Sequence, residues 1–151
     1  MDTQEHVIIN IFNEGSQDLP VYARRGDAGM DVRASKDISI AAGETVLVPT
    51  GLYFGLPEGW EIQIRPRSGM SLKTKLRISN GPGTLDQNYT GELCILLDNI
   101  GKVDTTVTKG ERIAQIIAKR VPQIIWNSVD SKEELGYTNR GTAGFGSSGS
   151  H

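Results

Sequence analysis

Apolar residues recur at every second position in several short runs of this chain, and this spacing constrains the fold more than any other feature. A period of two is typical of a strand with one buried face and one exposed face. The alternating residues are Ile38 and Ile40, Val46 and Val48, and Trp60, Ile62 and Ile64. Residues 91–97 and 112–118 are more continuously apolar. These two segments are predicted to form buried central strands.

Glycine and proline mark turns between these runs. Such turn signals lie at residues 42–43, 49–51, 56–59, 81–83, 101 and 109–110. Many short strands at this spacing predict an all-β sandwich or barrel. One segment differs, because Ser68 can cap a helix, and residues 68–73 are therefore predicted to form one or two helical turns.

Composition limits the size of the fold and the class of partner. The chain has 151 residues and a mass of 16.4 kDa, which fits one domain. Hydrophobic residues make up 37%, enough for a globular core. The formal net charge of −2 and the pI of 5.7 argue against a nucleic-acid partner, because such binders are normally basic. A small ligand that carries phosphate remains allowed, because it needs only a local cluster of positive charge.

The scarcity of cysteine and histidine excludes several kinds of site. Cys94 is the only cysteine, which excludes an internal disulfide and a cysteine-based zinc site and suits a reducing compartment. His6 and His151 are the only histidines, so we exclude a Ser-His-Asp triad and a multi-histidine metal cage.

No basic and then apolar leader begins the chain, and no apolar run approaches the ~18 residues of a membrane span. We therefore predict a cytoplasmic protein, or one in the host cytoplasm if it is viral, with no membrane partner.

Two charged segments have no obvious role in a core. Asp31 lies in residues 27–32 and, taken alone, would be only a turn carboxylate. Arg65, Arg67 and Ser68 lie within four residues of one another and could form a solvated edge. Arginine beside hydroxyl groups is also a good binder of oxyanions.

A third segment, residues 80–92, begins with a Gly-Pro-Gly turn and continues with alternating residues, which predicts a β-hairpin. A plain surface hairpin explains the glycines, but it does not explain why Asn80, Asp86 and Tyr89 lie so close together. An amide, a carboxylate and a phenol ring can together read a base edge, activate a water molecule and stack on a sugar.

Residues 140–150 consist mainly of glycine, serine, threonine and alanine, a composition typical of a flexible tail. Phe145 is the exception, because a linker has no use for an exposed aromatic ring. Residues 144–149 match G-x-G-x-x-G, but only two residues follow, so no helix can form behind the glycines and we exclude a dinucleotide site.

Five segments, in order, resemble the five motifs of the homotrimeric deoxyuridine triphosphatase (dUTPase) family. They are residues 28–32, 66–69, 83–92, 110–115 and 140–149. The resemblance implies a distorted jelly-roll or barrel-like domain with a flexible C-terminal arm. It implies that residues 1–139 form the β domain and that residues 140–151 form a lid that becomes ordered on substrate.

The resemblance also implies an activity: hydrolysis of dUTP to dUMP and pyrophosphate, which supplies dUMP for thymidylate synthesis and keeps uracil out of DNA. Asp86 would activate the attacking water, and Asp31 would help to hold Mg²⁺ through water, with the triphosphate as the main ligand of the ion. The implied substrate-binding residues are Arg67, Ser68, Gly69, Asn80, Leu85, Tyr89, Gln115, Arg140, Phe145, Gly146, Ser147 and Ser148.

Individual roles follow from the same resemblance. Tyr89 would pack on the deoxyribose and leave no room for a 2′-hydroxyl, while Asn80 would read uracil and Phe145 would stack on it. Arg140 would meet the γ-phosphate. The partner implied is two further copies of the same chain, in a trimer whose sites combine the Asp86 segment of one chain, the phosphate-binding motifs of a second and the tail of the third.

Two other functions fit the same scaffold. One is a non-catalytic nucleotide-sensing or regulatory protein, and the other is an enzyme like the related deoxycytidine triphosphate deaminase. A degenerate sensor would be expected to lose Asp86 or Arg140, and both are present. The tail motif and the spacing of Asp86 and Tyr89 favour dUTPase over the deaminase.

Overall fold

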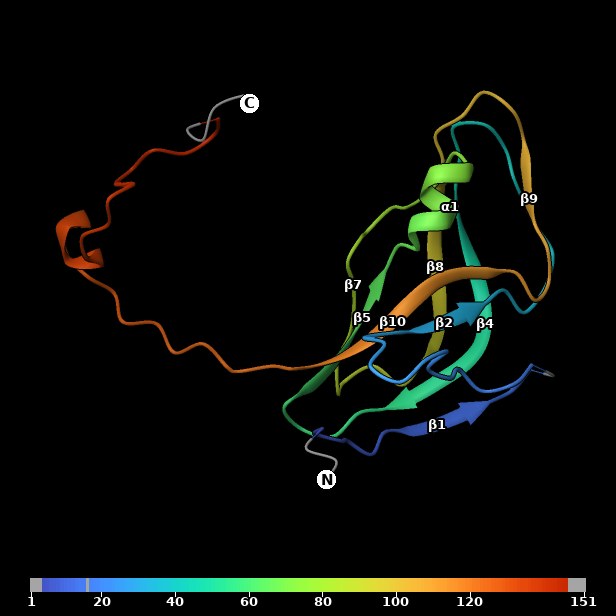
Figure 1. Cartoon of the computed structure of the whole chain (residues 1–151), viewed down its shortest axis with the longest axis horizontal. Helices are drawn as coiled ribbons and strands as arrows, with labels where there is room; N and C mark the ends of the chain where they lie inside the picture. Colours follow the sequence, from blue (N-terminus) through green and yellow to red (C-terminus); the bar gives the residue numbers. More distant parts are fainter. Residues whose placement is uncertain (1–3, 16, 147–151) are drawn as a thin grey trace.

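The computed structural model describes residues 4–15 and 17–146, and their regular secondary structure consists mainly of strands (Figure 1). The predicted all-β class is confirmed. In the described ranges no helix has the length and apolar character needed to cross a membrane. The elements are β1 (Asn10–Asn13), β2 (Met30–Arg33), β3 (Ile38–Ile40), β4 (Thr45–Gly55), β5 (Trp60–Arg65), α1 (Ser68–Lys73), β6 (Leu76–Ile78), β7 (Gly83–Leu85), β8 (Glu92–Asn99), β9 (Thr105–Val107), β10 (Arg112–Arg120) and the 3₁₀ helix η1 (Lys132–Leu135).

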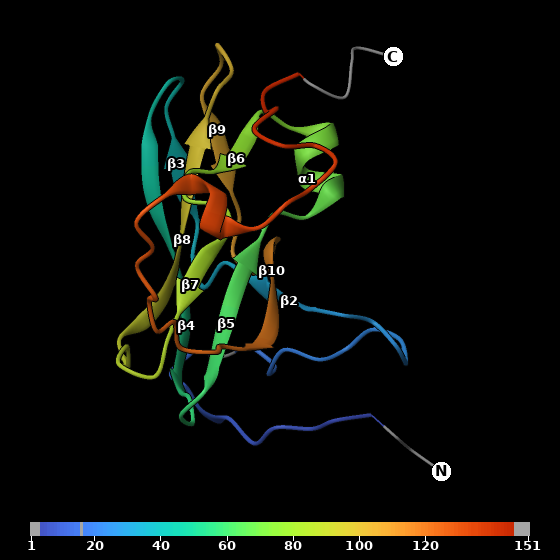
Figure 2. The ribbon, with the colours of Figure 1, turned by 90° about the vertical axis from the view of Figure 1, so that its left-hand side faces the viewer.

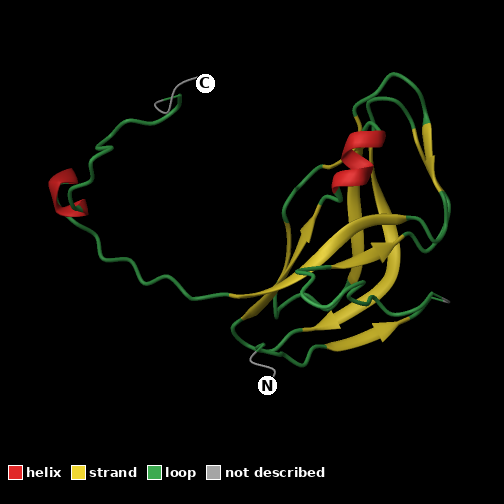
Figure 3. Ribbon diagram, viewed as in Figure 1, coloured by secondary structure: helices red, strands yellow, loops and turns green. Residues whose placement is uncertain are grey.

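The strands form two four-stranded sheets, with orders β1-β4-β8-β6 and β2-β10-β5-β7, and a small β3-β9 pair. All pairings are antiparallel. The sheets of the described chain do not close into a barrel, so the architecture is a distorted jelly roll. Figure 3 shows α1 and η1 as the helical segments of this strand-rich fold.

The core lies where the two large sheets face each other. Alternating residues of β5 and β8 enter it, as a period of two requires. The buried residues contributed by these two strands are Ile62, Ile64, Leu93, Ile95 and Leu97. Ile40 and Val48 are buried as well, so the alternating pattern in the sequence identified the inward face correctly.

Two of the predicted local features are wrong. Residues 49–51 do not turn between strands, because β4 runs through them as one strand of 11 residues. The pairing of β4 with β8 is irregular between Pro49 and Tyr53. Gly51, at φ +72°, lies within this irregularity, so the strand continues through the glycine. β8 is central, as predicted, but only every second residue is buried, so its outer face is only partly covered.

Residues 80–92 do not form a hairpin either. β7 pairs with β5 in one sheet, whereas β8 pairs with β4 and β6 in the other. The chain between them, residues 86–91, is therefore a connection from one sheet to the other, which we call the inter-sheet loop. The glycines and proline of this segment precede a connection between two sheets and not a hairpin, because β7 and β8 each pair with strands that are distant in the sequence.

After Arg120 the chain leaves the sheets as an extended arm, residues 121–146 of the described structure (Figures 1 and 2). Three large apolar side chains near its start are exposed: Ile124 by 70%, Ile125 by 94% and Trp126 by 84%. η1 is the one regular element of the described arm, and Ser131 and Glu134 cap it with a reciprocal pair of hydrogen bonds.

Candidate functional site

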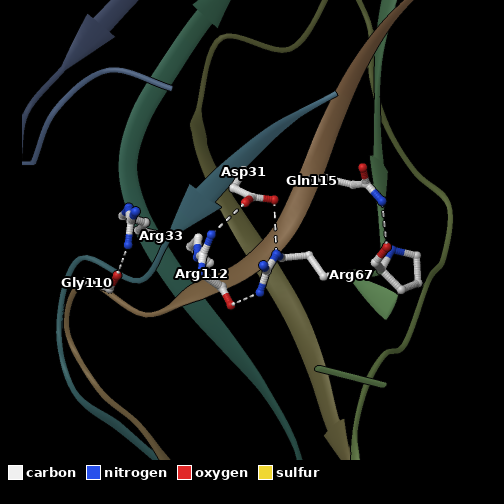
Figure 4. A network of polar contacts seen from close by, with 7 residues as sticks. Asp31, Arg33, Arg67, Gly110, Arg112 and Gln115 are labelled. Atoms are coloured by element: carbon white, nitrogen blue, oxygen red, sulfur yellow. Dashed lines mark hydrogen bonds and ion pairs between the residues drawn. The ribbon is translucent and has the colours of Figure 1, made fainter. Parts of the chain in front are cut away.

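Asp31 on β2 is the centre of a network of charged side chains (Figure 4). Its Oδ1 accepts a hydrogen bond of 3.0 Å from Nε of Arg67, and its Oδ2 lies 3.6 Å from Nη1 of Arg112. The side chains of Asp31 and Arg67 are only 34% and 24% exposed, so water screens this pair less than a surface pair. Asp31 is therefore more than a turn carboxylate, because it holds the Arg67 guanidinium by a hydrogen bond and pairs with the half-exposed Arg112.

Strand pairing explains why these groups meet. Arg112 begins β10, which is the neighbour of β2, and Arg67 lies between β5 and α1. Nη1 of Arg67 also donates to the backbone oxygen of Arg112, at 3.4 Å. Arg33 at the end of β2 donates to the backbone oxygen of Gly110, at 2.7 Å, and holds the turn that precedes β10. The first, second and fourth sequence motifs thus meet at one edge of the fold.

Gln115 occupies the middle of this region on β10. Its Nε2 donates to the backbone oxygen of Pro66, at 3.0 Å, which ties β10 to the segment that carries Arg67 (Figure 4). Gly29 packs against the same side chain. A Cβ at Gly29 would lie 3.0 Å from Oε1 of Gln115 and 3.0 Å from the backbone oxygen of Ile116. The glycine of the first motif is thus required by close packing.

Asp86 follows β7 and opens the inter-sheet loop. Its Oδ1 accepts a hydrogen bond from the backbone N–H of Asn88 at 2.9 Å, and its backbone oxygen accepts from the N–H of Tyr89 at 3.2 Å. This tight turn orients an exposed carboxylate whose Oδ2 has no hydrogen-bond partner among the described residues. Such an oxygen is available to accept a proton.

Tyr89 is half-exposed, and its ring is held in place at both ends. Its hydroxyl donates to the backbone oxygen of Glu92, at 2.7 Å. A Cβ at Gly91 would lie 2.8 Å from the same hydroxyl oxygen, so only glycine leaves room for the ring. Leu85, in contrast, points into the core and is 6% exposed, so only its backbone can reach a ligand.

A shallow hollow of about 560 Å³ lies beside these motifs. It is lined by Gln63, Arg65, Pro66, Ser68, Gly81, Pro82 and Gln115. Asn80 is exposed next to it, and its Nδ2 would lie 3.4 Å from a Cβ on Gly83. Ser68 and Gly69 lie in the first turn of α1, directly after Arg67. The hollow is therefore lined by members of the second and fourth motifs and by the Gly81-Pro82 turn that precedes the third.

A larger hollow of about 700 Å³ lies elsewhere on the surface. Residues near the N-terminus line it together with Phe54, Trp60, Ile62 and Ile117. Its lining also includes charged residues, among them Arg24, Arg25 and Asp27, but none of the predicted site residues. Its size alone does not make it the site.

The tail residues are not brought to the other motifs. Nε of Arg140 donates to the backbone oxygen of Ala143 at 2.6 Å, and the exposed Phe145 contacts no part of the core. Both lie on the arm, away from the sheets, as does Gly146 (Figure 1). The predicted phosphate contacts Ser147 and Ser148 lie outside the described residues. One chain by itself thus presents the body motifs and the tail motif separately.

Arg112 has no role predicted from the sequence, although it lies in the fourth motif. Its ion pair with Asp31 depends on the register of β2 and β10, with Gln115 opposite Asp31. The available signal was an arginine at the start of a predicted strand, with a lone aspartate on another. Without knowledge of which strands are neighbours, that signal does not predict the pair.

The described residues contain no group of three or more histidine, cysteine, aspartate or glutamate side chains that could hold a metal ion. Asp31 is the only carboxylate in the charged network, and two arginines already engage it. A protein cage for a cation is therefore not built here. A donor set of one carboxylate fits Mg²⁺ that is carried mainly by phosphate oxygens and water.

Comparisons with known proteins agree with the motif pattern. Curated relatives named deoxyuridine 5'-triphosphate nucleotidohydrolase include one from Rickettsia felis, which is 46% identical over 136 residues and covers 89% of this chain and 90% of its own. Another, from Chlamydia felis, is 43% identical over 138 residues and covers 90% of this chain and 94% of its own.

Solved structures share the fold. A Staphylococcus bacteriophage 80alpha dUTPase variant with dUpNHpp matches with a TM-score of 0.84 at 24% identity, over 95% of this chain and 99% of its own. A variant dUTPase from phage phi11 of S. aureus, described with a structural Mg(II) ion, matches with a TM-score of 0.75 at 20% identity, over 84% of this chain and 99% of its own. The sequence model of the dUTPase family matches residues 15–149, and this chain belongs to that family.

Proposed function

We propose that this protein hydrolyses dUTP to dUMP and pyrophosphate. The observation that carries the proposal is the joint presence of an oriented carboxylate with a free oxygen, Asp86, and a pair of fixed guanidinium groups, Arg67 and Arg112. The first can accept a proton from water, and the second can neutralise a triphosphate. The names of the relatives supply the substrate: they are deoxyuridine 5'-triphosphate nucleotidohydrolases.

The hydrolytic step needs one base and one leaving group. Oδ2 of Asp86 takes a proton from a water molecule, and the oxygen of that water forms a bond to the α-phosphorus of dUTP. The bond from the α-phosphorus to the bridging oxygen breaks, and pyrophosphate leaves with the bonding electrons. Guanidinium groups stabilise the charge that collects on the phosphate oxygens. The step needs no covalent nucleophile from the protein.

The remaining body residues bind and orient the nucleotide. Arg67, Ser68, Gly69 and Gln115 contact the phosphates, and Asn80 reads uracil with help from the backbone of Leu85. Tyr89 packs on the deoxyribose, where its fixed ring excludes a 2′-hydroxyl. That orientation depends on the hydroxyl contact with Glu92 and on the absence of a side chain at Gly91. The sugar is thus selected by shape.

Mg²⁺ bound to the triphosphate supplies charge neutralisation and makes pyrophosphate a better leaving group. This chain would contribute one carboxylate to the binding of the ion, because Asp31 would reach it through water. The direct contacts of Asp31 are with Arg67 and Arg112. Asp31 therefore orients the arginines and assists the ion's water shell from the same position.

The arm completes the site in a homotrimer. Residues 140–151 form a lid in which Arg140 meets the γ-phosphate, Phe145 stacks on uracil, and Gly146, Ser147 and Ser148 contact phosphate. The separation of the arm from the Asp86 loop in one chain favours a lid donated by another chain (Figure 1). Two surfaces support assembly: the exposed Ile124, Ile125 and Trp126 on the arm, and the hollow of about 700 Å³, whose apolar wall residues, Phe54, Trp60 and Ile117 among them, could receive such a segment.

An activity assay with Asp86→Asn tests the proposal. The variant keeps size and hydrogen-bonding capacity but loses basicity, so kcat for dUTP should fall by at least about 100-fold. Binding of the non-hydrolysed analogue dUpNHpp should persist. Asp104→Asn is the matched control, because Asp104 is another exposed carboxylate that accepts a backbone hydrogen bond, from Ala42, far from the site.

The assay also separates the other functions considered. The wild-type protein should release dUMP and pyrophosphate from dUTP and should release no ammonia from dCTP. A wild-type protein that binds dUTP without turnover, or an Asp86→Asn variant with more than a tenth of the wild-type kcat, would contradict the proposal.

A further inference from the structure

The sequence singled out Arg65 together with Arg67 and Ser68 as a possible binder of oxyanions, but Arg65 has no role in the proposed function. In the register of the sheet, Gln115 on β10 lies directly opposite Asp31 on β2 and directly opposite Arg65 on β5. Opposed residues of antiparallel strands project from the same face, with Cβ atoms about 4.5–5.5 Å apart. Asp31, Gln115 and Arg65 therefore form one row across three strands. The first two members already belong to the proposed phosphate site.

The guanidinium of Arg65 is fixed by its neighbour on the same face, Gln63. Oε1 of Gln63 accepts from Nε of Arg65 at 3.1 Å and from Nη2 at 2.7 Å. These two hydrogen bonds engage one edge of the guanidinium group and set its orientation. The Nη1 group has no hydrogen bond within the described residues, so it remains able to donate to a ligand.

The charge of Arg65 is also uncompensated in the part of the chain that the structure describes. Arg67 and Arg112 pair with Asp31, whereas Arg65 forms no ion pair there and has an uncharged partner. Its side chain is only partly exposed. Keeping a half-buried cation away from carboxylates is costly unless another anion visits it. A phosphate group would satisfy both the charge and the free donors.

The hollow beside Arg65 gives such an anion a place. Arg65, Gln63, Gln115 and Ser68 all line the same space of about 560 Å³. Ser68 and Gln115 are proposed phosphate contacts, so the Arg65 guanidinium and these donors face one cavity. The cation and the polar donors thus converge from three different segments: β5, β10 and the start of α1.

We propose that Arg65 is a further phosphate-binding residue of the dUTP site, and that Gln63 is the residue that positions it. Nη1 of Arg65 contacts the triphosphate from the β5 side, opposite the pair of arginines held by Asp31. The proposal rests on the proposed function, because it takes the triphosphate as the ligand of this hollow.

Titration of the purified protein with dUpNHpp tests this role. Arg65→Gln should weaken dUpNHpp binding by about tenfold or more, the usual cost of losing a hydrogen bond to a charged group. Arg65→Lys keeps the charge but loses the fork and should recover part of the affinity. Gln63→Met should cause a smaller loss, because it frees the guanidinium without removing it. The Kd of Arg65→Gln should also depend less steeply on salt concentration.

Arg77→Gln is the matched control. Arg77 is another half-buried strand arginine bonded to neutral groups, the backbone oxygens of Thr74 and Leu76, but it lies in the other sheet. Its Kd for dUpNHpp should match the wild type. Equal Kd values for Arg65→Gln and Arg77→Gln would overturn the inference, as would a loss in Arg65→Gln accompanied by a lower melting temperature and an equal loss of dUMP binding. If wild-type protein fails to bind dUpNHpp at all, the proposed function itself fails.

Discussion

The sheet that carries Asp31 and the arm that carries Arg140 contrast in how they hold residues of the proposed site. Asp31, Arg67, Arg112 and Gln115 are fixed by strand register, ion pairs and hydrogen bonds before any ligand arrives. Arg140 lies on an extended segment whose hydrogen bond is to Ala143, within the arm itself. One half of the proposed site is thus formed by folding, whereas the tail half lies apart from it in the single chain. A tail that closes over the site, as proposed, would let the site open for substrate and close for chemistry.

The two halves also differ in what sets their geometry. In the body of the fold, glycines at positions 29 and 91 allow close approach between packed groups. In the arm, Gly141 and Gly146 have positive φ values of 59° and 82° with nothing near their Cβ positions, so glycine is favoured there by the backbone conformation. Glycine thus serves close packing in one region and a left-handed backbone in the other.

Among the variants that distinguish the sheet from the arm, removal of residues 140–151 should have the largest effect on activity. We expect kcat/KM for dUTP to fall by about 10²–10³-fold, the usual cost of losing a donor to developing charge. The melting temperature should not change, because the described tail residues make no contact with the core. Steady-state kinetics and differential scanning calorimetry measure the two quantities. A truncated protein within threefold of the wild-type kcat/KM would show that the lid is dispensable.

Asp31→Asn should disturb the half that is built by folding. The change removes the charge that holds Arg67 and Arg112, so kcat/KM should fall by about tenfold, mainly through KM. The Mg²⁺ concentration for half-maximal activity should also rise, because Asp31 is proposed to assist the ion through water. Initial rates over a dUTP and Mg²⁺ grid test both effects. A wild-type KM would mean that the arginines hold their positions without Asp31.

Gly29→Ala should reveal how tightly β2 packs on β10. The added Cβ would lie 3.0 Å from the backbone oxygen of Ile116, which cannot move without shifting the strand. Overpacking of this kind costs about 1–3 kcal/mol, or several degrees in melting temperature. Gly69→Ala is the matched control for stability, because nothing lies within 4 Å of its Cβ position. Equal melting temperatures for the two variants would contradict the packing argument.

The smallest effect is expected for Asp98→Asn, on the stability of the fold in acid. Hydroxyl groups of Ser79 and Thr45 donate to its carboxylate and hold its pKa below the ordinary value. A carboxyl with a lowered pKa in the folded state stabilises the fold above its unfolded pKa of about 3.9, and this contribution is lost as pH falls through the folded pKa. The melting-temperature difference between wild type and Asp98→Asn should therefore be constant near neutral pH and shrink below about pH 4. A difference that does not vary with pH would contradict this cause.

The fold was predictable from sequence where the signal is local. Alternation of apolar residues identified the inward face of Ile62 and Ile64, and the helical turns predicted for residues 68–73 are present as α1. The reason given for them was wrong, because the N-cap is Arg67 and no side chain caps the helix, so Ser68 does not act as a cap. The errors at residues 49–51 and 80–92 have one cause. Glycine and proline indicate a change of direction or register, but whether a strand ends, bulges or changes sheet depends on distant pairing partners.

The sequence predicted which residues belong to the proposed site, but it did not predict which of them contact one another. Motif order singled out Asp31, Arg67 and Gln115, and the structure brings these three together. The contact of Arg112 with Asp31 and the place of Arg65 opposite Gln115 follow only from the registers of β10 with β2 and β5. Such registers follow from long-range packing, which a reading of one segment at a time does not contain.

Mixing two inactive variants tests most directly that Asp86 and the tail of one site come from different chains. Asp86→Asn protein and protein truncated before Arg140 are unfolded together, refolded at equal concentration, and assayed with dUTP after mixed trimers have been verified by mass. A working site then takes its Asp86 from a truncated chain and its tail from an Asp86→Asn chain, so about a quarter of the wild-type activity should return. No activity from verified mixed trimers would contradict the shared site.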